Sequence, residues 1–540
     1  MTPGMQASWR LLHSGLLRVG LPLWLLNTLL SFVNPGPTPW PEFSARLAPE
    51  LCLAMAGVAG WIAWRGRLPG RTLHALAALT AMLVAVRAIE VTSAAMFGRS
   101  LNLYWDGRHL GEVLAMNGVP AWQIAGGVLL VAAAIVALYL LALWSWRALR
   151  QGLAHGALRG SALLAVAAAL AALALHGAGG PDTGRFFAEP VAPVMARQAR
   201  LVVAQLRADG TESRLTPSPS FDADLAALRG ADVLLLFAES YGVSTLDDPV
   251  QTHALAAPRA RLAEAIAASG RHVVSARVRS PTFAGGSWLA HGALLSGVDT
   301  RDPLDYDVLL STERPSLPRQ FGARGYRTVS WMPGLQRPWP EGRFFGFDRY
   351  VDATNMGYAG PAFGPWRVPD QAAMALLHAQ ELAAPATARL PRFVVFPTVA
   401  SHAPFRPVAP FMADWTRLTG PTPYTPEEHA HALDEPASWR DPVPGYVHAI
   451  ASTWEWLGAY LRERAPPRLF TIVIGDHQAF AGVSGAGATW DVPVHLISDD
   501  AALLARFKQA GFVEGLTPRG PPLGDMHALT PLLLRTLSTP

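Results

Sequence analysis

Five long uncharged apolar segments in the first third of the sequence constrain its fold more than any other feature. They cover residues 19–33, 51–64, 72–86, 113–146 and 160–181. Because a helix needs about 20 apolar residues to cross the hydrocarbon core of a bilayer, each segment with its apolar flanks predicts a membrane-spanning helix. The weakest is 51–64, which has 14 residues. We therefore expect an all-α transmembrane domain at residues 1–180, with about five helices near 11–33, 49–64, 72–97, 120–146 and 160–178.

The arginines between these segments predict the orientation of that domain. Alternate loops are rich in arginine, while the loops between them balance arginine with acidic residues; the Arg-rich positions are Arg10, Arg18, Arg65, Arg67, Arg71, Arg147, Arg150 and Arg159. Positively charged loops face the cytoplasm, so an odd number of spans places the residues after about 180 outside it. This predicts a multi-pass protein of the cytoplasmic (inner) membrane with its large C-terminal part on the outer, periplasmic side.

The distribution of charge excludes one class of function. The first 176 residues carry 12 arginines and five acidic residues, whereas the remainder carries 32 basic and 35 acidic residues. The net charge of +4 therefore comes from arginines beside apolar segments, and not from a soluble basic face of the kind that binds nucleic acid. We expect a lipid bilayer and no nucleic acid among the partners. The single cysteine, Cys52, excludes an intramolecular disulfide and a Cys-based zinc site.

Two opposite charges lie inside the third apolar segment. Arg87 and Glu90 are three residues apart, so they share one face of the expected helix. A charge within a membrane is costly and needs a partner. The pair is compatible with an ion pair on one helix face and with a contact to a lipid headgroup.

The residues after about 177 predict a soluble α/β domain. Short β-rich runs alternate with helical stretches such as 256–268 and 447–464; the runs are 233–237, 272–278, 327–331, 393–396, 469–474 and 492–497. Most are continuously apolar, as in parallel strands covered on both faces. The alternation predicts a doubly wound sheet. We expect a linker at 181–229, a domain at 230–540 and a Pro- and His-rich loop at 411–441.

Residues suited to binding metal or phosphate follow three of these runs. Glu239 follows 233–237, Asp476 and His477 follow 469–474, and His402 lies in the segment after 393–396. Ligands of open α/β sheets bind outside the carboxyl ends of the strands. Their shared position therefore predicts one site built from all three segments.

A serine at a predicted helix start belongs to the same pattern. Gly285 and Gly286 allow a tight turn, after which Ser287 opens an apolar helix. Free backbone N–H groups and the helix dipole favour a phosphoryl group there, although a serine at that position is also a common helix cap. With Glu239, Asp476 and His477, Ser287 would give one divalent ion three oxygen donors and one nitrogen, which suits Zn²⁺ or Mn²⁺ and leaves Mg²⁺ open. His402 would donate a proton or contact the transferring group.

These motifs resemble the membrane-anchored branch of the alkaline phosphatase/sulfatase superfamily, which contains lipoteichoic acid synthases, phosphoglycerol transferases and phosphoethanolamine transferases. The resemblance covers roughly residues 230–500 and the five-span anchor, and it rests on Gly475-Asp476-His477-Gln478, on the segment 287–297 and on Ser401-His402-Ala403-Pro404-Phe405. It implies the alkaline phosphatase/sulfatase type of doubly wound fold. It also implies that Glu239, Asp476 and His477 hold the metal, and that Ser287 is a nucleophile carrying a covalent phospho-intermediate.

The chain departs from the family at several positions. Many transferases of the branch have Thr where Ser287 stands, and Thr282 is a rival nucleophile; Ser287 is preferred because its distance to 294–297 matches the family's spacing. The chain lacks the Cys/Ser-x-Pro-Ser-Arg signature of true sulfatases, and Glu239 is not part of an Asp-Asp pair, which suggests one principal metal. By resemblance, Trp339 and Arg343 are candidate substrate contacts, with a packing Trp and a solvated Arg as the alternative.

The leading hypothesis is therefore a metal-dependent phosphotransferase. It would move a phosphoryl-linked headgroup, of phosphoglycerol or phosphoethanolamine type, from a membrane phospholipid to a glycan or lipid acceptor through Ser287. The same site could hydrolyse phosphate or sulfate esters. A catalytically silent membrane-anchored binding module is the third interpretation.

Overall fold

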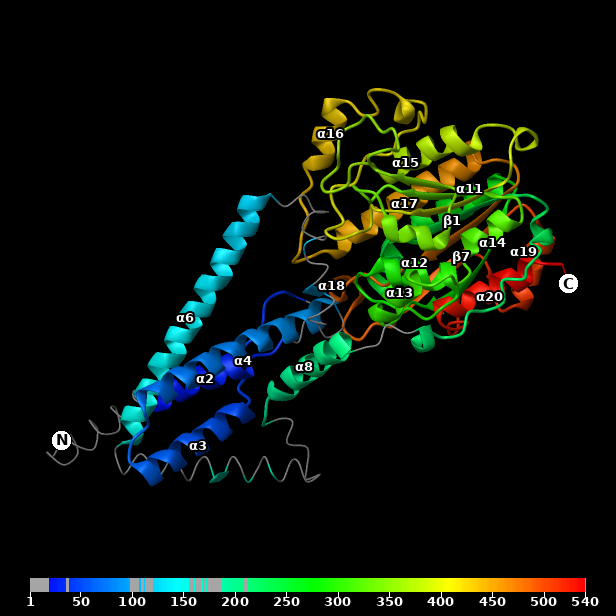
Figure 1. The fold of residues 1–540 in the computed structure, drawn as a ribbon. Coiled ribbons are helices and arrows are strands. Elements are labelled where there is room, and N and C mark those ends of the chain that lie inside the picture. The colour runs from blue at the N-terminus through cyan, green and yellow to red at the C-terminus, as the bar shows by residue number, and fades with distance from the viewer. Residues whose placement is uncertain are drawn as a thin grey trace. The chain divides into compact units, whose positions relative to one another are not determined.

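The computed structural model describes residues 19–34, 38–97, 120–154, 186–207 and 212–539, together with isolated residues between 106 and 174 (Figure 1). Contacts divide the chain into two compact units, the first ending at Arg207 and the second lying mainly in Ala208–Pro540. The division lies within the predicted linker, 181–229, whose described residues include helix α8 (Ala192–Arg207).

The regular elements described in the first unit are helices. They are α2 (Leu21–Ser31), α3 (Pro49–Arg65), α4 (Gly70–Phe97), α6 (Ala121–Leu153) and α8. Two helical stretches, Gly70–Met96 and Ala121–Leu153, are long and apolar enough to cross a membrane. Leu129 and Leu130 on α6 are 70% and 72% exposed, as expected of a surface that faces lipid. Most of the predicted fifth helix at 160–178, residues 11–18 of the first, and Arg10, Arg18 and Arg159 lie outside the described residues. The count of five spans and the orientation remain predictions.

The two charges of the third apolar segment contact different partners. The Arg87 guanidinium donates to the backbone carbonyls of Ser31, Phe32 and Glu189, at 3.3, 2.6 and 2.8 Å. Glu90 forms an ion pair with Arg197 of α8. Arg87 thus has partners within the protein, where it joins α4 to the end of α2 by bonds to backbone oxygens.

An eight-stranded sheet forms the centre of the second unit. Its order is β4-β3-β5-β1-β6-β7-β2-β8. The strands are β1 (Asp232–Ala238), β2 (His272–Arg279), β3 (Arg327–Met332), β4 (Arg349–Asp352), β5 (Arg392–Pro397), β6 (Leu469–Gly475), β7 (Asp491–Ser498) and β8 (Val513–Glu514). The pairings make β1 to β6 parallel to one another, whereas β7 and β8 run antiparallel to their neighbours. The carboxyl ends of β1, β2, β5 and β6 therefore meet at one edge.

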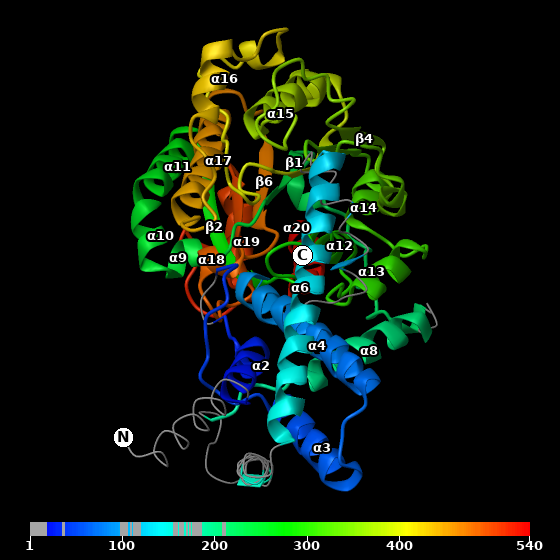
Figure 2. The ribbon, with the colours of Figure 1, turned by 90° about the vertical axis from the view of Figure 1, so that its left-hand side faces the viewer.

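Helices cover both faces of the sheet, as Figure 2 shows with α11 and α17 on one side and α12 and α14 on the other. Alternate residues of β1 point to opposite faces: Leu234 and Leu236 belong to one apolar core, and Val233, Leu235 and Phe237 to the other. The first core contains α11 (Ala256–Ala268), α15 (Asp370–Leu377) and α17 (Val443–Glu463). The second contains α12 (Ser287–Ser296), α14 (Leu317–Ala323), α19 (Ala501–Gln509) and α20 (Met526–Leu537). The predicted doubly wound α/β fold is confirmed.

The second unit differs from the sequence prediction in three details. The run 492–497 is strand β7, but it is antiparallel. Two strands, β4 and β8, were not predicted, because they have four and two residues and little continuous apolar sequence. The predicted loop 411–441 contains α16 (Pro426–Leu433), which begins at a capping box formed by Thr425 and Glu428. The remaining short α-helices among the described residues are α9 (Ser244–Asp247), α10 (Pro249–Ala254), α13 (Pro303–Leu310) and α18 (Ala481–Ser484).

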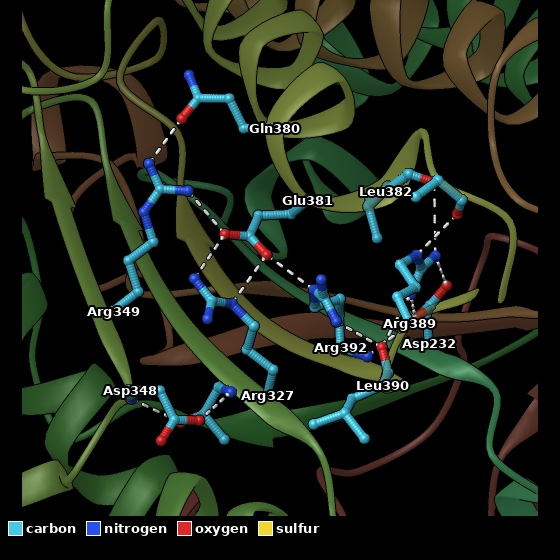
Figure 3. A network of polar contacts seen from close by, with 12 residues as sticks. Asp232, Arg327, Asp348, Arg349, Gln380, Glu381, Leu382, Arg389, Leu390 and Arg392 are labelled. Carbon is cyan, nitrogen blue, oxygen red and sulfur yellow. Dashed lines mark hydrogen bonds and ion pairs between the residues drawn. The ribbon is translucent and has the colours of Figure 1, made fainter. Parts of the chain in front are cut away.

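The amino ends of four parallel strands are held by a network of ion pairs (Figure 3). Arg327, Arg349 and Arg392 are the first residues of β3, β4 and β5, and all three contact the buried carboxylate of Glu381, at 2.7 to 3.2 Å. Asp232, the first residue of β1, pairs with Arg389 at 2.6 Å. These contacts fix strand starts at one edge of the sheet, while the candidate site occupies the opposite edge.

Candidate active site

Three candidate metal ligands meet at the carboxyl edge of the sheet. Ala238 and Gly475 are paired in register at the ends of β1 and β6, so the next residues, Glu239 and Asp476, are neighbours. Glu239, Asp476 and His477 each offer a ligand atom, and these atoms lie within 4.8 Å of one another. Their side chains are buried, at 7%, 1% and 2% exposure. The structure thus brings together the three residues that the sequence predicted as a group.

The backbone around this cluster is tightly packed. A Cβ at Gly475 would lie 1.9 Å from the carbonyl oxygen of Tyr241, so only glycine fits there. Ser240 adopts the left-handed conformation, with φ 53°, and its hydroxyl donates to Glu239 Oε1 at 2.9 Å. The Ser401 hydroxyl donates to the Glu239 carbonyl at 2.5 Å. Both strand ends are therefore held in a fixed conformation.

Asp476 and His477 are oriented by their own hydrogen bonds. Asp476 Oδ1 accepts from the backbone N–H groups of Ser240 and His477, both at 2.7 Å. Its other oxygen, Oδ2, is buried and accepts no hydrogen bond from the described residues. His477 Nδ1 lies 2.8 Å from the Gln478 carbonyl, which leaves Nε2 towards Glu239 and Asp476, at 3.6 and 3.8 Å. In metal sites, a ligand side chain is typically held by hydrogen bonds on one side and leaves a ligand atom open on the other. Asp476 and His477 show this arrangement.

The cluster places two carboxyl groups, those of Glu239 and Asp476, close together in a buried space. Burial and the neighbouring charge of Glu239 raise the pKa of Asp476 to about 6. Burial also lowers the pKa of His477, but the charges of Asp476 and Glu239 outweigh that effect and the pKa lies above its ordinary value. Two carboxylates in a buried space are unfavourable without a compensating cation. The unpartnered Oδ2 of Asp476 and the donor set therefore fit a divalent metal.

Ser287 lies against this cluster at the start of α12. Gly286 precedes it in the left-handed conformation, with φ 75°. Ser287 Oγ is 3.3 Å from Glu239 Oε2 and 3.2 Å from His477 Nε2. Gly286, and not Ser287, holds the N-cap position of α12. Its hydroxyl faces the candidate ligands and does not cap the helix.

The rival nucleophile has a different environment. Thr282 is 6% exposed, and its hydroxyl donates to the Gly285 carbonyl at 2.5 Å. A Cβ at Gly286 would lie 2.9 Å from Thr282 Oγ1, so the threonine packs directly beneath the turn. Thr282 thus stabilises the loop that presents Ser287.

His402 occupies the loop after β5. Its Nδ1 lies 2.7 Å from the Ala403 carbonyl, and its ring packs edge-on against Trp366 with ring centroids 4.9 Å apart. Burial lowers the pKa of His402, and the charges of His477 and Asp476 also act on it. The loop is held by Asp370, whose carboxylate accepts from the backbone N–H groups of Val399 and Ala400 at 2.8 and 3.0 Å.

Trp366 and Asp370 were missed by the sequence analysis. Both lie between β4 and β5, outside the apolar runs from which the strands were predicted. The available signal was Pro369-Asp370 at the start of the apolar helix α15, a pattern typical of a helix start. No sequence pattern indicated that Trp366 would contact His402.

The predicted substrate contacts lie on the short helix Pro340–Phe345 and beside it. Trp339 packs against Phe345, with ring centroids 5.5 Å apart, and Arg343 is exposed. No hydrogen bond among the described residues joins either one to Glu239, Asp476 or His477. Their role in substrate binding stays a prediction.

One further histidine lies near Ser287. His291, one turn along α12, packs against Phe237 in a tilted arrangement, with ring centroids 4.2 Å apart. Burial lowers the pKa of His291 to about 4, so the ring is neutral at pH 7. Its contacts are those of a packing residue.

Several solved structures are similar to this chain. Lipoteichoic acid synthase LtaP from Listeria monocytogenes is 14% identical with a TM-score of 0.34, over 52% of this chain and 68% of that one. A protein in the alkaline phosphatase superfamily from Vibrio parahaemolyticus is 14% identical with a TM-score of 0.35, over 57% and 66%. The C-terminal periplasmic domain of EcEptC from Escherichia coli is 13% identical with a TM-score of 0.35, over 57% and 82%. The chain matches no family profile and no curated protein sequence.

Proposed function

We propose that this chain is a membrane-anchored, metal-dependent phosphotransferase that uses Ser287 as its nucleophile. It moves a phosphoryl-linked headgroup, of phosphoglycerol or phosphoethanolamine type, from a membrane phospholipid to a glycan or lipid acceptor. The observation that carries the proposal is the position of Ser287 Oγ, 3.3 Å from Glu239 Oε2 and 3.2 Å from His477 Nε2, at a helix start. A hydroxyl that faces buried metal-type ligands, and that caps nothing, is placed for nucleophilic attack.

Glu239, Asp476 and His477, with Ser287, are the residues that would hold the metal. Bound there, a divalent cation supplies Lewis-acid stabilisation of the attacking oxygen and of the charge on the transferring group. We propose Zn²⁺ or Mn²⁺ because the set includes a nitrogen donor beside the oxygens, and Mg²⁺ is the alternative.

Two half-reactions follow from these residues. In the first, Ser287 Oγ bonds to phosphorus, the bond from phosphorus to the diacylglycerol oxygen breaks, and the Ser287 proton passes towards Glu239 Oε2, which accepts its hydrogen bond. In the second, the acceptor hydroxyl bonds to phosphorus, the bond to Ser287 Oγ breaks, and the proton held by Glu239 returns to Ser287 Oγ. In its doubly protonated form, His402 would give the Nε2 proton to the leaving diacylglycerol oxygen and then take one back from the acceptor hydroxyl, since Nδ1 donates to the Ala403 carbonyl and Nε2 is left for substrate. Trp339 and Arg343 are proposed to contact the headgroup.

Membrane attachment supports a lipid donor. Two helices are long and apolar enough to span a bilayer, and we propose that the chain spans the cytoplasmic membrane several times with its α/β domain on the periplasmic side. A site tethered to the bilayer meets phospholipid at a high effective concentration. The donor therefore needs no strong binding of its own.

The test uses the full chain in nanodiscs that contain Mn²⁺ or Zn²⁺ and phosphatidylglycerol or phosphatidylethanolamine labelled in the headgroup. We expect a headgroup-phosphate adduct on the peptide that contains Ser287, detected by mass spectrometry, and none in Ser287→Ala. An adduct on Thr282 would overturn the assignment of the nucleophile. Undiminished headgroup transfer by Ser287→Ala would overturn the mechanism.

Product analysis in the same experiment separates the competing functions. Headgroup on a larger acceptor supports transfer, whereas release of free headgroup with water as the acceptor indicates a hydrolase. A purified chain that binds no divalent ion and forms no adduct would instead be a binding module.

A further inference from the structure

A small cavity borders the loop that carries His402. Its volume is about 30 Å³, which is room for about two water-sized groups. Its walls include Val399 and Ala400 of that loop and Trp366, the residue whose ring packs against His402. Trp366 and the loop of His402 thus border both the cavity and the candidate active site.

Two residues that line this cavity, Tyr424 and Trp456, carry buried hydrogen-bond donors that have no partner among the described residues. Tyr424 and Trp456 are 3% and 2% exposed, and neither Tyr424 Oη nor Trp456 Nε1 has a hydrogen-bond partner among the described residues. Buried polar groups in proteins are nearly always paired, and leaving one unpaired costs about 1 to 3 kcal/mol. The pair therefore points to an occupant that accepts hydrogen bonds.

The remaining walls limit the chemistry of that occupant. Phe363 and Trp366 present aromatic rings, and Pro369, Pro407 and Pro410 add apolar surface. Asp370 also lines the cavity, and its carboxylate already accepts two backbone hydrogen bonds. Burial raises the pKa of Asp370 to about 7, so the carboxyl group is partly ionised at neutral pH, and the ionised form repels a phosphate or carboxylate group. An uncharged group with a short carbon skeleton and an oxygen acceptor fits.

We propose that this cavity is a binding subsite for an uncharged hydroxymethyl group of the substrate, from a sugar or from glycerol. Its size matches one carbon and one oxygen, its walls suit the carbon, and Tyr424 and Trp456 supply donors to the oxygen. The inference rests on the proposed function of the neighbouring site and deepens it, because the subsite selects a polyol and holds it beside His402. A glycan acceptor and a glycerol-containing lipid share this chemistry.

The test measures binding and needs no turnover. Saturation-transfer NMR on the full chain in nanodiscs uses three probes: glycerol, methyl α-D-glucopyranoside and methyl 6-deoxy-α-D-glucopyranoside, which lacks the hydroxymethyl oxygen. We expect glycerol or the glucoside to bind, and the 6-deoxy probe to bind roughly three- to tenfold more weakly than the glucoside, as for one lost hydrogen bond. Binding of glycerol alone identifies a lipid-type group, and binding of the glucoside a glycan.

Matched variants locate the binding. Tyr424→Phe and Trp456→Phe should each weaken the better probe by roughly three- to tenfold. Tyr326→Phe and Trp415→Phe are the controls, because they remove donors that are equally unpartnered among the described residues but do not line the cavity. Ala409→Leu narrows the cavity from a partly buried wall and should abolish probe binding.

Three results would overturn the proposal: no probe binding to the wild-type chain, equal binding of the glucoside and its 6-deoxy form, or equal loss in cavity and control variants. Ser287→Ala should bind the probes normally, since Ser287 does not line the cavity. Failure of the proposed function would appear as a missing Ser287 adduct, which this binding measurement does not use.

Discussion

Ser287 Oγ lies 3.2 Å from His477 Nε2, although 190 residues separate the two in the chain. Ser287 begins helix α12 after β2, and His477 follows β6. Two features of the fold bring them together: the parallel direction of β2 and β6, and the left-handed turn at Gly286. The hydroxyl consequently faces buried candidate ligands, while Gly286 holds the N-cap position of the helix. This contact supports the proposal that Ser287 is a nucleophile and not an ordinary helix cap, and the first prediction follows from it.

Ser287→Ala should abolish transfer and leave the fold intact. Loss of the nucleophile is expected to lower kcat by roughly three orders of magnitude or more, by analogy with other covalent enzymes. The melting temperature should hardly change because the N-cap position of α12 belongs to Gly286 and not to Ser287. Ser287→Thr should retain activity, since it keeps the hydroxyl. A large fall in melting temperature in Ser287→Ala would show that the serine is structural.

Asp476→Asn should stabilise the metal-free domain while abolishing metal binding. Burial and Glu239 raise the pKa of Asp476 to about 6, so the folded state disfavours its charge. The favourable contribution of Asp476 to the free energy of unfolding is complete below its unfolded pKa of about 3.9. It is lost as pH rises through the folded pKa of about 6, and the loss is at most about 3 kcal/mol. The asparagine variant escapes this loss.

Chemical unfolding in EDTA from pH 4 to pH 8 tests whether the wild type loses stability, relative to the variant, as pH rises. The free energy of unfolding of the variant, relative to wild type, should increase between pH 4 and pH 6 and then level off. Added Mn²⁺ or Zn²⁺ should stabilise only the wild type, because the variant has lost a ligand charge. A variant that is less stable than wild type at pH 8 in EDTA would contradict the electrostatic account.

The strands and the ligand group could be predicted from sequence because each depends on local pattern. Continuous apolar runs such as 233–237 and 469–474 indicate buried parallel strands, and the residue after each run must lie at the carboxyl edge. Strand β4 could not be predicted, since its first two residues, Arg349 and Tyr350, are only half-buried. Trp366 and Asp370 reach His402 and its loop through tertiary packing, which leaves no periodic trace in the sequence.

Glu381→Gln should destabilise the domain without changing its chemistry. Burial alone would raise the pKa of Glu381, but hydrogen bonds from Arg349, Arg392 and Arg327 hold it below its ordinary value (Figure 3). Removing this charge leaves the arginines at the starts of β3, β4 and β5 without their shared partner, at an expected cost of about 3 kcal/mol. Urea unfolding measures the loss, and Glu428→Gln, which breaks the more exposed pair with Arg417, is the matched control with a much smaller effect.

Asp370→Asn tests whether the loop of His402 must be held in place for turnover. The Asp370 carboxylate accepts from both Val399 N–H and Ala400 N–H, and an amide can accept from only one of them because its nitrogen is a donor. The loop should loosen, and kcat should fall roughly ten- to a hundredfold, whereas metal affinity stays unchanged because the ligands lie on other loops. Steady-state kinetics beside a metal titration measures both quantities. Asp352→Asn, whose carboxylate accepts hydrogen bonds within its own turn after β4, is the control. Equal loss of metal affinity and kcat in Asp370→Asn would mean that the residue supports the whole site and not the His402 loop.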